Sequence, residues 1–237
     1  MASTLSTQSD PISVEGGSLK NNKITNGKTT NMLAEQNIAT IRTTGEGTSH
    51  DAWMTIENPL EGVQITFLET AEETGGARIV MRMIVKPGGG VAPEVHTKFT
   101  ETYEVLEGTL TLEIGGKATT LTPGRTLSAL PGIFHRVHND TATPVVLRVV
   151  ATPGSDAERG LRAYFGMVRD GLVTPTGMPK NLFIGALVLH QAGTYFPPLP
   201  IWISRIIFGA LAVVGRWIGG EKAIALYYER PALKISF

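Results

Sequence analysis

The sequence predicts a mainly β fold, either a sandwich or a small barrel, followed by a helical extension. Residues 52–153 break into short runs rich in Val, Ile, Thr and aromatic residues, and Gly, Pro, Asn or Asp separates the runs. This pattern is typical of strands and turns. Residues 156–237 instead carry longer apolar stretches with helical spacing. Because no helical pattern interrupts the strand region, a sandwich or barrel is expected there.

The first part of the chain has a different composition. Half of residues 1–50 are Ser, Thr, Asn or Gly, and the apolar residues follow no strand or helix period. Such a segment buries too little surface to offset the entropy lost on ordering. We therefore predict a disordered lead-in over 1–50, a β domain over 51–155 and a helical, hydrophobic extension over 156–237.

Composition excludes several classes of function. The 21 basic residues equal the 21 acidic ones, so no general basic excess is available to bind nucleic acid. The absence of cysteine excludes disulfides, thiolate metal sites and cysteine nucleophiles. The polar opening lacks the apolar core of a signal peptide, and a cytoplasmic location is expected.

Local patterns refine the β domain. Residues 77–86 alternate between apolar and basic side chains, as a half-buried strand does. Gly115-Gly116 and Asn139-Asp140 are expected to form hairpin turns. In the extension, helices are expected over 158–171, 178–193 and 201–218.

Two stretches of the β domain combine glycines with metal-binding side chains. The first runs from Gly90 to Gly108, with six residues between Glu101 and its last glycine. The second runs from Gly124 to Asn139. Both resemble the two conserved motifs of the cupin superfamily, the second with Leu130 in place of a proline. The resemblance implies a jelly-roll barrel holding one divalent metal ion, with Glu94, His96, Glu101 and His135 as its ligands.

The expected ligand types agree with this. Residues two apart on a strand share a face, so Glu94 and His96 both point into the barrel. Imidazole and carboxylate suit Fe, Mn, Ni or Zn. The family's usual set has three His and one Glu, and Glu94 stands where the first His is expected. Glu94 is therefore either a ligand or a general base.

The remaining candidates are assigned as follows. Tyr103, with Glu94, is a candidate catalytic residue. Core packing alone explains why Tyr103, Met81, Met83 and Phe134 are expected to line the barrel interior. Lys98 either faces inward and anchors an anionic substrate or, as we favour, lies in solvent after a turn. His138 is expected on the outer surface.

We predict a mononuclear metal-dependent enzyme that acts on a small organic molecule. Its reaction is an oxidation or dioxygenation, or an isomerase or lyase step. The alternative is a non-catalytic cupin that binds a small ligand, as a membrane-associated sensor.

The apolar stretch 199–220 needs a partner. Arg205, Gly209, Ala212 and Arg216 form a narrow stripe on a helix that is apolar elsewhere. The barrel wall or a second copy in a homodimer is the favoured partner. Contact with an anionic membrane surface ranks second and a membrane span third.

Overall fold

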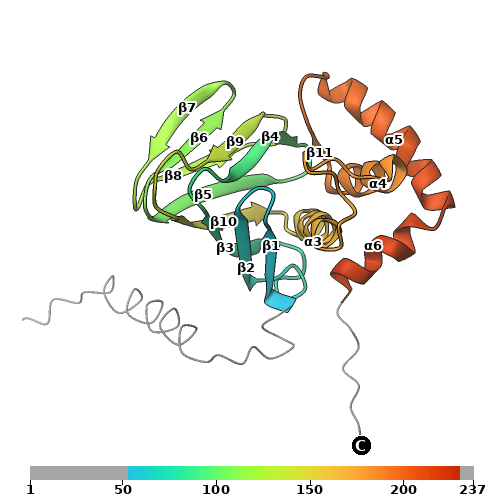
Figure 1. Ribbon diagram of the computed structural model, residues 1–237, viewed down its shortest axis with the longest axis horizontal. Coiled ribbons are helices and arrows are strands. Elements are labelled where there is room, and N and C mark those ends of the chain that lie inside the picture. The colour runs from blue at the N-terminus through green and yellow to red at the C-terminus, as the bar shows by residue number, and fades with distance from the viewer. Residues whose placement is uncertain (1–52, 230–237) are drawn as a thin grey trace, which may run out of the picture. The chain divides into compact units, whose positions relative to one another are not determined.

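The computed structural model describes residues 53–229, so the predicted disordered lead-in lies outside the described residues. The described residues belong to one compact unit, Gly47–Phe237. Strands lie on one side of this unit and helices on the other (Figure 1). The division into domains at residues 155 and 156 stays a prediction.

Within residues 53–229, eleven antiparallel strands form two sheets, which confirms the mainly β jelly-roll fold. The six-stranded sheet has the order β1 (Thr55–Asn58), β2 (Val63–Glu69), β3 (Ile79–Val85), β10 (Val145–Thr152), β5 (Thr100–Glu107) and β8 (Thr126–Ala129). The five-stranded sheet has the order β11 (Thr194–Tyr195), β4 (Gly90–His96), β9 (His135–His138), β6 (Leu110–Ile114) and β7 (Lys117–Leu121).

Alternation along the strands builds the core between the sheets. On β3 the side chains of Ile79, Met81, Met83 and Val85 are buried, as the sequence pattern predicts. Burying one such side chain contributes roughly 1.5–3 kcal/mol of transfer free energy. This shared inner face fixes which side of each strand points toward the site described below.

One predicted hairpin turn is confirmed and the other is wrong. Gly115 and Gly116 join β6 to β7 with φ values of +59° and +79°, which glycine adopts without strain. Asn139 and Asp140 form no hairpin, because β9 and β10 belong to different sheets. The buried Asn139 amide instead donates to the Val85 and Thr143 carbonyls and fastens the chain where it crosses between sheets.

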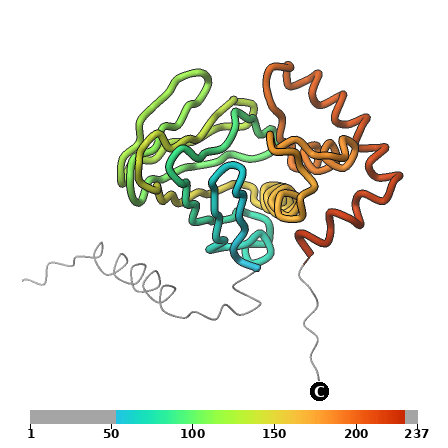
Figure 2. The backbone as a smooth tube through the Cα atoms, viewed as in Figure 1, coloured from blue at the N-terminus to red at the C-terminus, as the bar shows by residue number. Residues whose placement is uncertain are grey.

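Four helices follow the β domain: α3 (Ser155–Arg169), α4 (Leu182–Ala192), α5 (Ile201–Trp217) and α6 (Gly220–Tyr228). The first three match the expected helices with shifted ends, and α6 was not predicted. Gly219, with a φ of +85°, turns the chain by 94° between α5 and α6, so the apolar pattern does not continue in one direction. The tube in Figure 2 follows this path around one end of the sandwich.

A buried ion pair within α3 also contacts residues at and beside the six-stranded sheet. Glu158 accepts hydrogen bonds from the Ala71 amide at 2.6 Å and from Arg162 Nε at 2.8 Å. Arg162 also donates to the Trp53 carbonyl at 2.7 Å, and its guanidinium lies 4.1 Å from the centre of the Phe67 ring. The contacts with Ala71, Trp53 and Phe67 therefore join the helix to the first strands of the six-stranded sheet.

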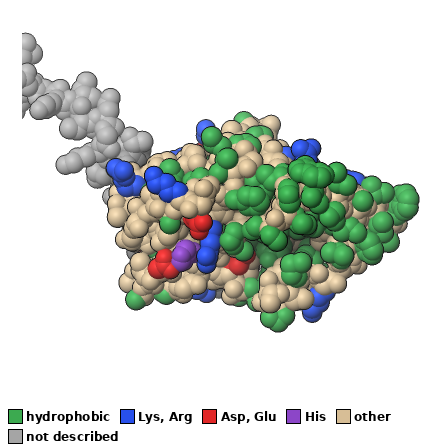
Figure 3. All heavy atoms as spheres, turned by 90° about the horizontal axis from the view of Figure 1, so that it is seen from above, with side chains coloured by type: hydrophobic (Ala, Val, Ile, Leu, Met, Phe, Trp, Pro, Cys, Tyr) green, Lys and Arg blue, Asp and Glu red, His purple; other side chains and the backbone are tan. Residues whose placement is uncertain are grey.

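Helix α5 turns a strip of small residues toward α4 and leaves several of its large apolar residues exposed. A Cβ on Gly209 would lie 3.2 Å from the His190 ring, and Ala212 is fully buried. The side chains of Trp202, Ile206 and Trp217 are exposed by 65%, 64% and 82%. Apolar side chains accordingly gather over the helical side of the surface in Figure 3. The homodimer and the membrane-surface contact through residues 199–220 stay predictions.

Within the described residues, no single helix has both the length and the apolar character needed to cross a membrane. Helices α5 and α6 meet that requirement only when taken together, across their 94° bend.

Candidate metal centre

Both sheets contribute side chains to one cluster in the barrel. Glu94 and His96 lie on β4, and His135 lies opposite Glu94 on the neighbouring strand β9. Glu101 comes from β5 of the other sheet. One nitrogen or oxygen atom from each of the four lies within 4.8 Å of the others. The structure thus brings together all four residues that the motifs indicate.

The distances between the four side chains would allow them to bind one shared metal ion. His96 Nε2 lies 3.2 Å from Glu101 Oε2 and 3.5 Å from Glu94 Oε1. His135 Nε2 lies 3.5 Å from Glu101 Oε2 and 4.0 Å from Glu94 Oε1. The set offers two imidazole nitrogens and two carboxylates, which suit first-row divalent ions.

Burial and charge make the cluster strongly coupled. Burial opposes a positive charge on His96, but Glu101 and Glu94 outweigh it and raise the pKa of His96 to about 10. Burial also opposes ionisation of Glu101, yet the charge of His96, its hydrogen bond to Glu101 and the charge of His135 hold the pKa of that carboxyl well below its usual value. The cluster therefore favours positive charge between its carboxylates, supplied by protons or by a cation.

One buried atom indicates which of these fits better. His135 Nδ1 donates to the Ile133 carbonyl at 3.2 Å, so its Nε2 faces the cluster. Among the described residues, this buried Nε2 has no hydrogen-bond partner. A buried polar atom without a partner is costly, and a metal ion at the centre of the four donors would satisfy it. The residues present therefore fit a metal ion.

Thr194 is a contributor that the motifs do not reveal. It lies on β11, in the predicted extension, and pairs in register with His96. Its hydroxyl lies 3.0 Å from His96 Nδ1, and the Phe99 ring stacks on the same imidazole at 4.2 Å. These contacts hold the ring with Nε2 toward the cluster. No sequence signal places a threonine 98 residues away against this histidine.

Replacing Thr194 by valine removes this hydroxyl while keeping the side-chain shape. We expect the affinity for Zn(II) to fall about 10- to 100-fold, as is typical when the partner of a ligating histidine is lost. Competition with a chelating dye measures this affinity. Thr194→Ser should retain the parent affinity, and equal affinities of the valine variant and the parent would contradict this role.

Tyr103 supports the cluster from β5. Its hydroxyl donates a hydrogen bond to Glu101 Oε2. Burial and the negative charge of Glu101 both raise the pKa of Tyr103 well above its usual value. Tyr103 therefore remains protonated and acts as a hydrogen-bond donor that orients Glu101.

Glu61 is a second residue that the sequence analysis missed. It follows β1, accepts a hydrogen bond from Asn58 at 2.7 Å and lines the same cavity as Glu94. Burial, with the charge of Glu94, raises the pKa of Glu61 to about 7. A carboxylic acid that titrates near neutral pH in such a cavity is suited to proton transfer.

Because the pKa of Glu61 is raised in the folded state, we expect Glu61→Gln to stabilise the metal-free protein by an amount that depends on pH. The Glu61 carboxyl keeps its proton up to about pH 7 in the folded state, whereas in the unfolded state it loses that proton near its ordinary pKa of 4.5. The cost of Glu61 is absent below that value, grows as the pH rises, and is complete above the folded pKa. In thermal melts, the Tm of the variant should exceed that of the parent by a margin that increases between pH 4.5 and about pH 7. A margin that stays constant over this range would contradict a raised pKa of Glu61.

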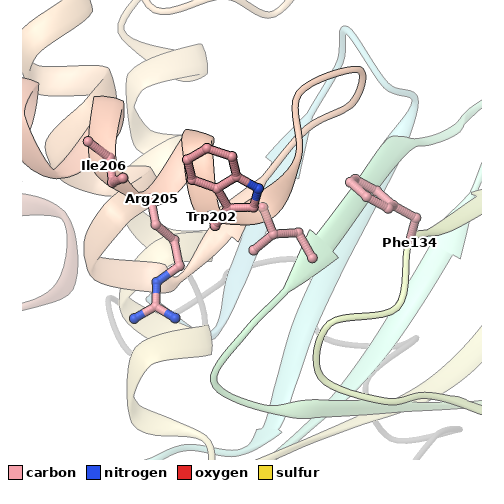
Figure 4. A pocket seen from close by; sticks show the side chains of 5 residues that line it. Phe134, Trp202, Arg205 and Ile206 are labelled. Carbon is pink, nitrogen blue, oxygen red and sulfur yellow. The ribbon is translucent and has the colours of Figure 1, made fainter.

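The structure also shows where three other residues discussed in the sequence analysis lie. Lys98 points outward, as favoured: it lies 3.1 Å from Asp156 Oδ2 and donates to the Gln191 carbonyl. His138 also lies at the surface, 2.8 Å from Asp140 Oδ1. Phe134 was wrongly expected in the barrel. It lines an open hollow beside Trp202 of α5 (Figure 4), because the loop before β9 turns it outward.

A cavity of about 390 Å³ adjoins the cluster. Strands β2, β3, β4 and β5 form part of its wall, and helices α3 and α4 form another part. Met83 and Tyr103 line it as expected, together with Glu94, His96 and Glu101. The helical extension therefore helps to enclose the space where a substrate could meet the cluster.

Known proteins agree with the fold and the motifs. A family model described as a cupin domain matches residues 81–151. Epoxidase atD of Aspergillus terreus is 33% identical over 135 residues, which cover 53% of this chain and 41% of that protein. Probable oxidoreductase patJ of Penicillium expansum is 26% identical over 141 residues, which cover 55% and 42%. The chain spans about two-fifths of the length of these curated relatives.

Solved structures show the same kind of similarity. A predicted oxalate decarboxylase from Thermotoga maritima matches with 25% identity and a TM-score of 0.37, over 38% of this chain and 80% of that one. A double-stranded β-helix protein from Klebsiella pneumoniae matches with 24% identity and a TM-score of 0.37, over 47% and 93%.

The two sheets, the two motifs and the matched family model define the class of protein as a double-stranded β-helix with a His/Glu cluster in its barrel. Residues 81–151 of this chain form a cupin domain.

Proposed function

We propose that this protein is a mononuclear metal-dependent cupin oxidoreductase that acts on a small organic molecule. The observation that carries the proposal is the cluster of two histidines and two glutamates, within 4.8 Å of one another, at the wall of a cavity. The names of two relatives, an epoxidase and a probable oxidoreductase, support oxidative chemistry.

Glu94, His96, Glu101 and His135 would hold one Fe, Mn, Ni or Zn ion. Such an ion supplies Lewis-acid or redox chemistry to a substrate in the cavity. Two carboxylates and two neutral imidazoles balance the charge of a divalent ion. Their burial keeps bulk water from competing with the substrate for the remaining positions.

The chain's own residues would orient the reactants and move protons. Tyr103 holds Glu101 in place through its hydrogen bond. The Glu94 side chain keeps 15% of its surface exposed, more than either histidine. It is therefore suited to accept a proton as well as to ligate. If Glu94 accepts a proton from the substrate, the proposed reaction can also be an isomerase or lyase step.

Nitric oxide tests whether the centre leaves a position open for oxygen. We expect the protein loaded anaerobically with Fe(II) to bind nitric oxide and give the EPR signal of a half-integer-spin iron–nitrosyl centre. His138→Ala, which changes a surface histidine, should give the same signal. An Fe(II)-loaded protein that binds no nitric oxide would contradict the proposed oxidative chemistry.

A non-catalytic ligand-binding barrel is the second candidate. It is favoured by the mainly apolar lining of the cavity and by the exposed apolar side chains of α5, which in a membrane-associated sensor would contact the membrane surface. Such a barrel would keep its affinity for a cavity ligand in His135→Ala. The proposed enzyme would lose its metal and any metal-dependent binding in the same variant.

A further inference from the structure

The cavity has two chemically different walls. The metal donors Glu94, His96 and Glu101 lie on the strand side. Helices α3 and α4 contribute mainly apolar side chains, among them Leu161, Phe165, Val188 and Leu189. A molecule that reached the metal donors would therefore place its other end against an apolar wall.

Aromatic rings are prominent in this lining. Phe99, Tyr164, Phe165, Phe196 and Phe208 all border the cavity. Phe99 is already stacked on the imidazole of His96. Aromatic rings pack favourably against other rings in offset or edge-on geometry, beyond the effect of apolar burial. The cavity lining therefore favours a flat, unsaturated ring over an extended polar chain.

The charges in the cavity disfavour an anion. Three carboxyl groups border it, those of Glu61, Glu94 and Glu101. The nearby basic residue Lys98 is directed away, to Asp156 and the Gln191 carbonyl. With a divalent ion balanced by Glu94 and Glu101, the remaining groups add no positive charge. A phosphate or a second carboxylate on the substrate would thus be desolvated without a partner.

The volume limits the size of the molecule. At about 30 Å³ per water, 390 Å³ corresponds to about 13 water molecules. Such a space lies near the lower end of ligand pockets, which are roughly 300–1,000 Å³. It accommodates one substituted six-membered ring or a small bicycle.

We propose that the substrate is a neutral, ring-containing molecule, in which two adjacent oxygen atoms chelate the metal and an aromatic or similar flat ring lies against the apolar wall of α3 and α4. This inference rests on the proposed function, because the metal centre fixes which end of the molecule carries the oxygen atoms. It adds the chemical class of the substrate.

Three probes that share one chelating group test the inference. 2-Hydroxyacetophenone, dihydroxyacetone and dihydroxyacetone phosphate all present a hydroxyl next to a ketone, and differ only in a phenyl, a hydroxymethyl or a phosphorylated end. In Zn(II)-loaded protein we expect the phenyl compound to bind at least about tenfold more tightly than dihydroxyacetone, since ring burial contributes roughly 1.5–3 kcal/mol. The phosphate should bind most weakly. Ligand-observed NMR measures the three Kd values.

Wall variants locate the bound ring. Leu161→Asn should reduce the preference for the phenyl compound about tenfold, and Leu161→Met should restore it. Leu172→Asn, at an exposed position after α3, is the matched control. If Leu161→Asn fails to fold, Val188→Thr introduces a hydroxyl into the wall with almost no change of shape, and should weaken the preference in the same direction.

The outcomes separate this inference from the proposed function. Equal affinities of the phenyl compound and dihydroxyacetone in metal-loaded protein, or a preference that no wall variant alters, would overturn the substrate class and leave the metal centre standing. A protein that takes up no metal would overturn the proposed function. Chelation by the substrate would be overturned with it. The contact between the ring and the apolar wall should still give a phenyl preference in the metal-free cavity, and loss of that preference would overturn the ring-containing class as well.

Discussion

Replacing His135 by alanine is expected to abolish stable metal binding. The variant removes one of four donors, and it removes the buried Nε2 that has no hydrogen-bond partner among the described residues. Loss of an outer partner of a ligand costs about 10- to 100-fold in metal affinity, and loss of a ligand itself should exceed that range. Equilibrium dialysis against Zn(II), followed by metal analysis, measures the change.

His138→Ala is the matched control for this prediction. His138 lies three residues along the chain on the same strand, and its ring contacts Asp140 at the surface instead of the cluster. It should bind Zn(II) as the parent does. If both variants retain the parent affinity, the cluster is not the metal site.

Replacing Arg162 by alanine is expected to produce the largest loss of stability. It leaves Glu158 buried with an uncompensated charge and removes the hydrogen bond to the Trp53 carbonyl. Breaking a buried pair in this way costs roughly 3–5 kcal/mol. For a protein of this size, that corresponds to a decrease in Tm of about 10 °C, which differential scanning calorimetry can detect.

Arg169→Ala serves as the control on the same helix. Arg169 pairs with Asp170, but its side chain is 70% exposed. Exposed ion pairs contribute about 0–1 kcal/mol, so the Tm should change little. Similar decreases in both variants would show that the buried position of Arg162 has no special importance for stability.

The fold and the four donors were predictable because they depend on local patterns. Alternation on β3 determines its inward face, and two-residue spacing on β4 places Glu94 and His96 on one side. The Glu101 and His135 positions follow from the resemblance to the two cupin motifs, Gly90–Gly108 and Gly124–Asn139. In each case the relevant signal lies within one short, continuous stretch of chain.

The parts that were missed depend on distant contacts. Thr194 reaches His96 only because the chain after α4 adds a short strand to β4, and two residues are too few to give a period. Glu61 enters the cavity from a turn, where no period applies. Phe134 was wrongly placed because the loop before β9 departs from the strand alternation that the expectation assumed.

Which face of helix α5 is buried could not be predicted from the sequence either. The apolar pattern predicts a helix over these residues, and the helix is there. The pattern does not reveal that Gly209, Ala212 and Gly215 face α4 while the tryptophans face outward. Close approach of two helices selects small side chains, and this selection competes with burial of the large ones.

Metal analysis of the protein, purified without chelators or a metal-affinity tag, tests the central claim most directly. Inductively coupled plasma mass spectrometry should find about one equivalent of Fe, Mn, Ni or Zn per chain, as the four-donor cluster requires, and His96→Ala should lose it. A metal-free protein that also fails to take up any of these ions when they are added would contradict the account.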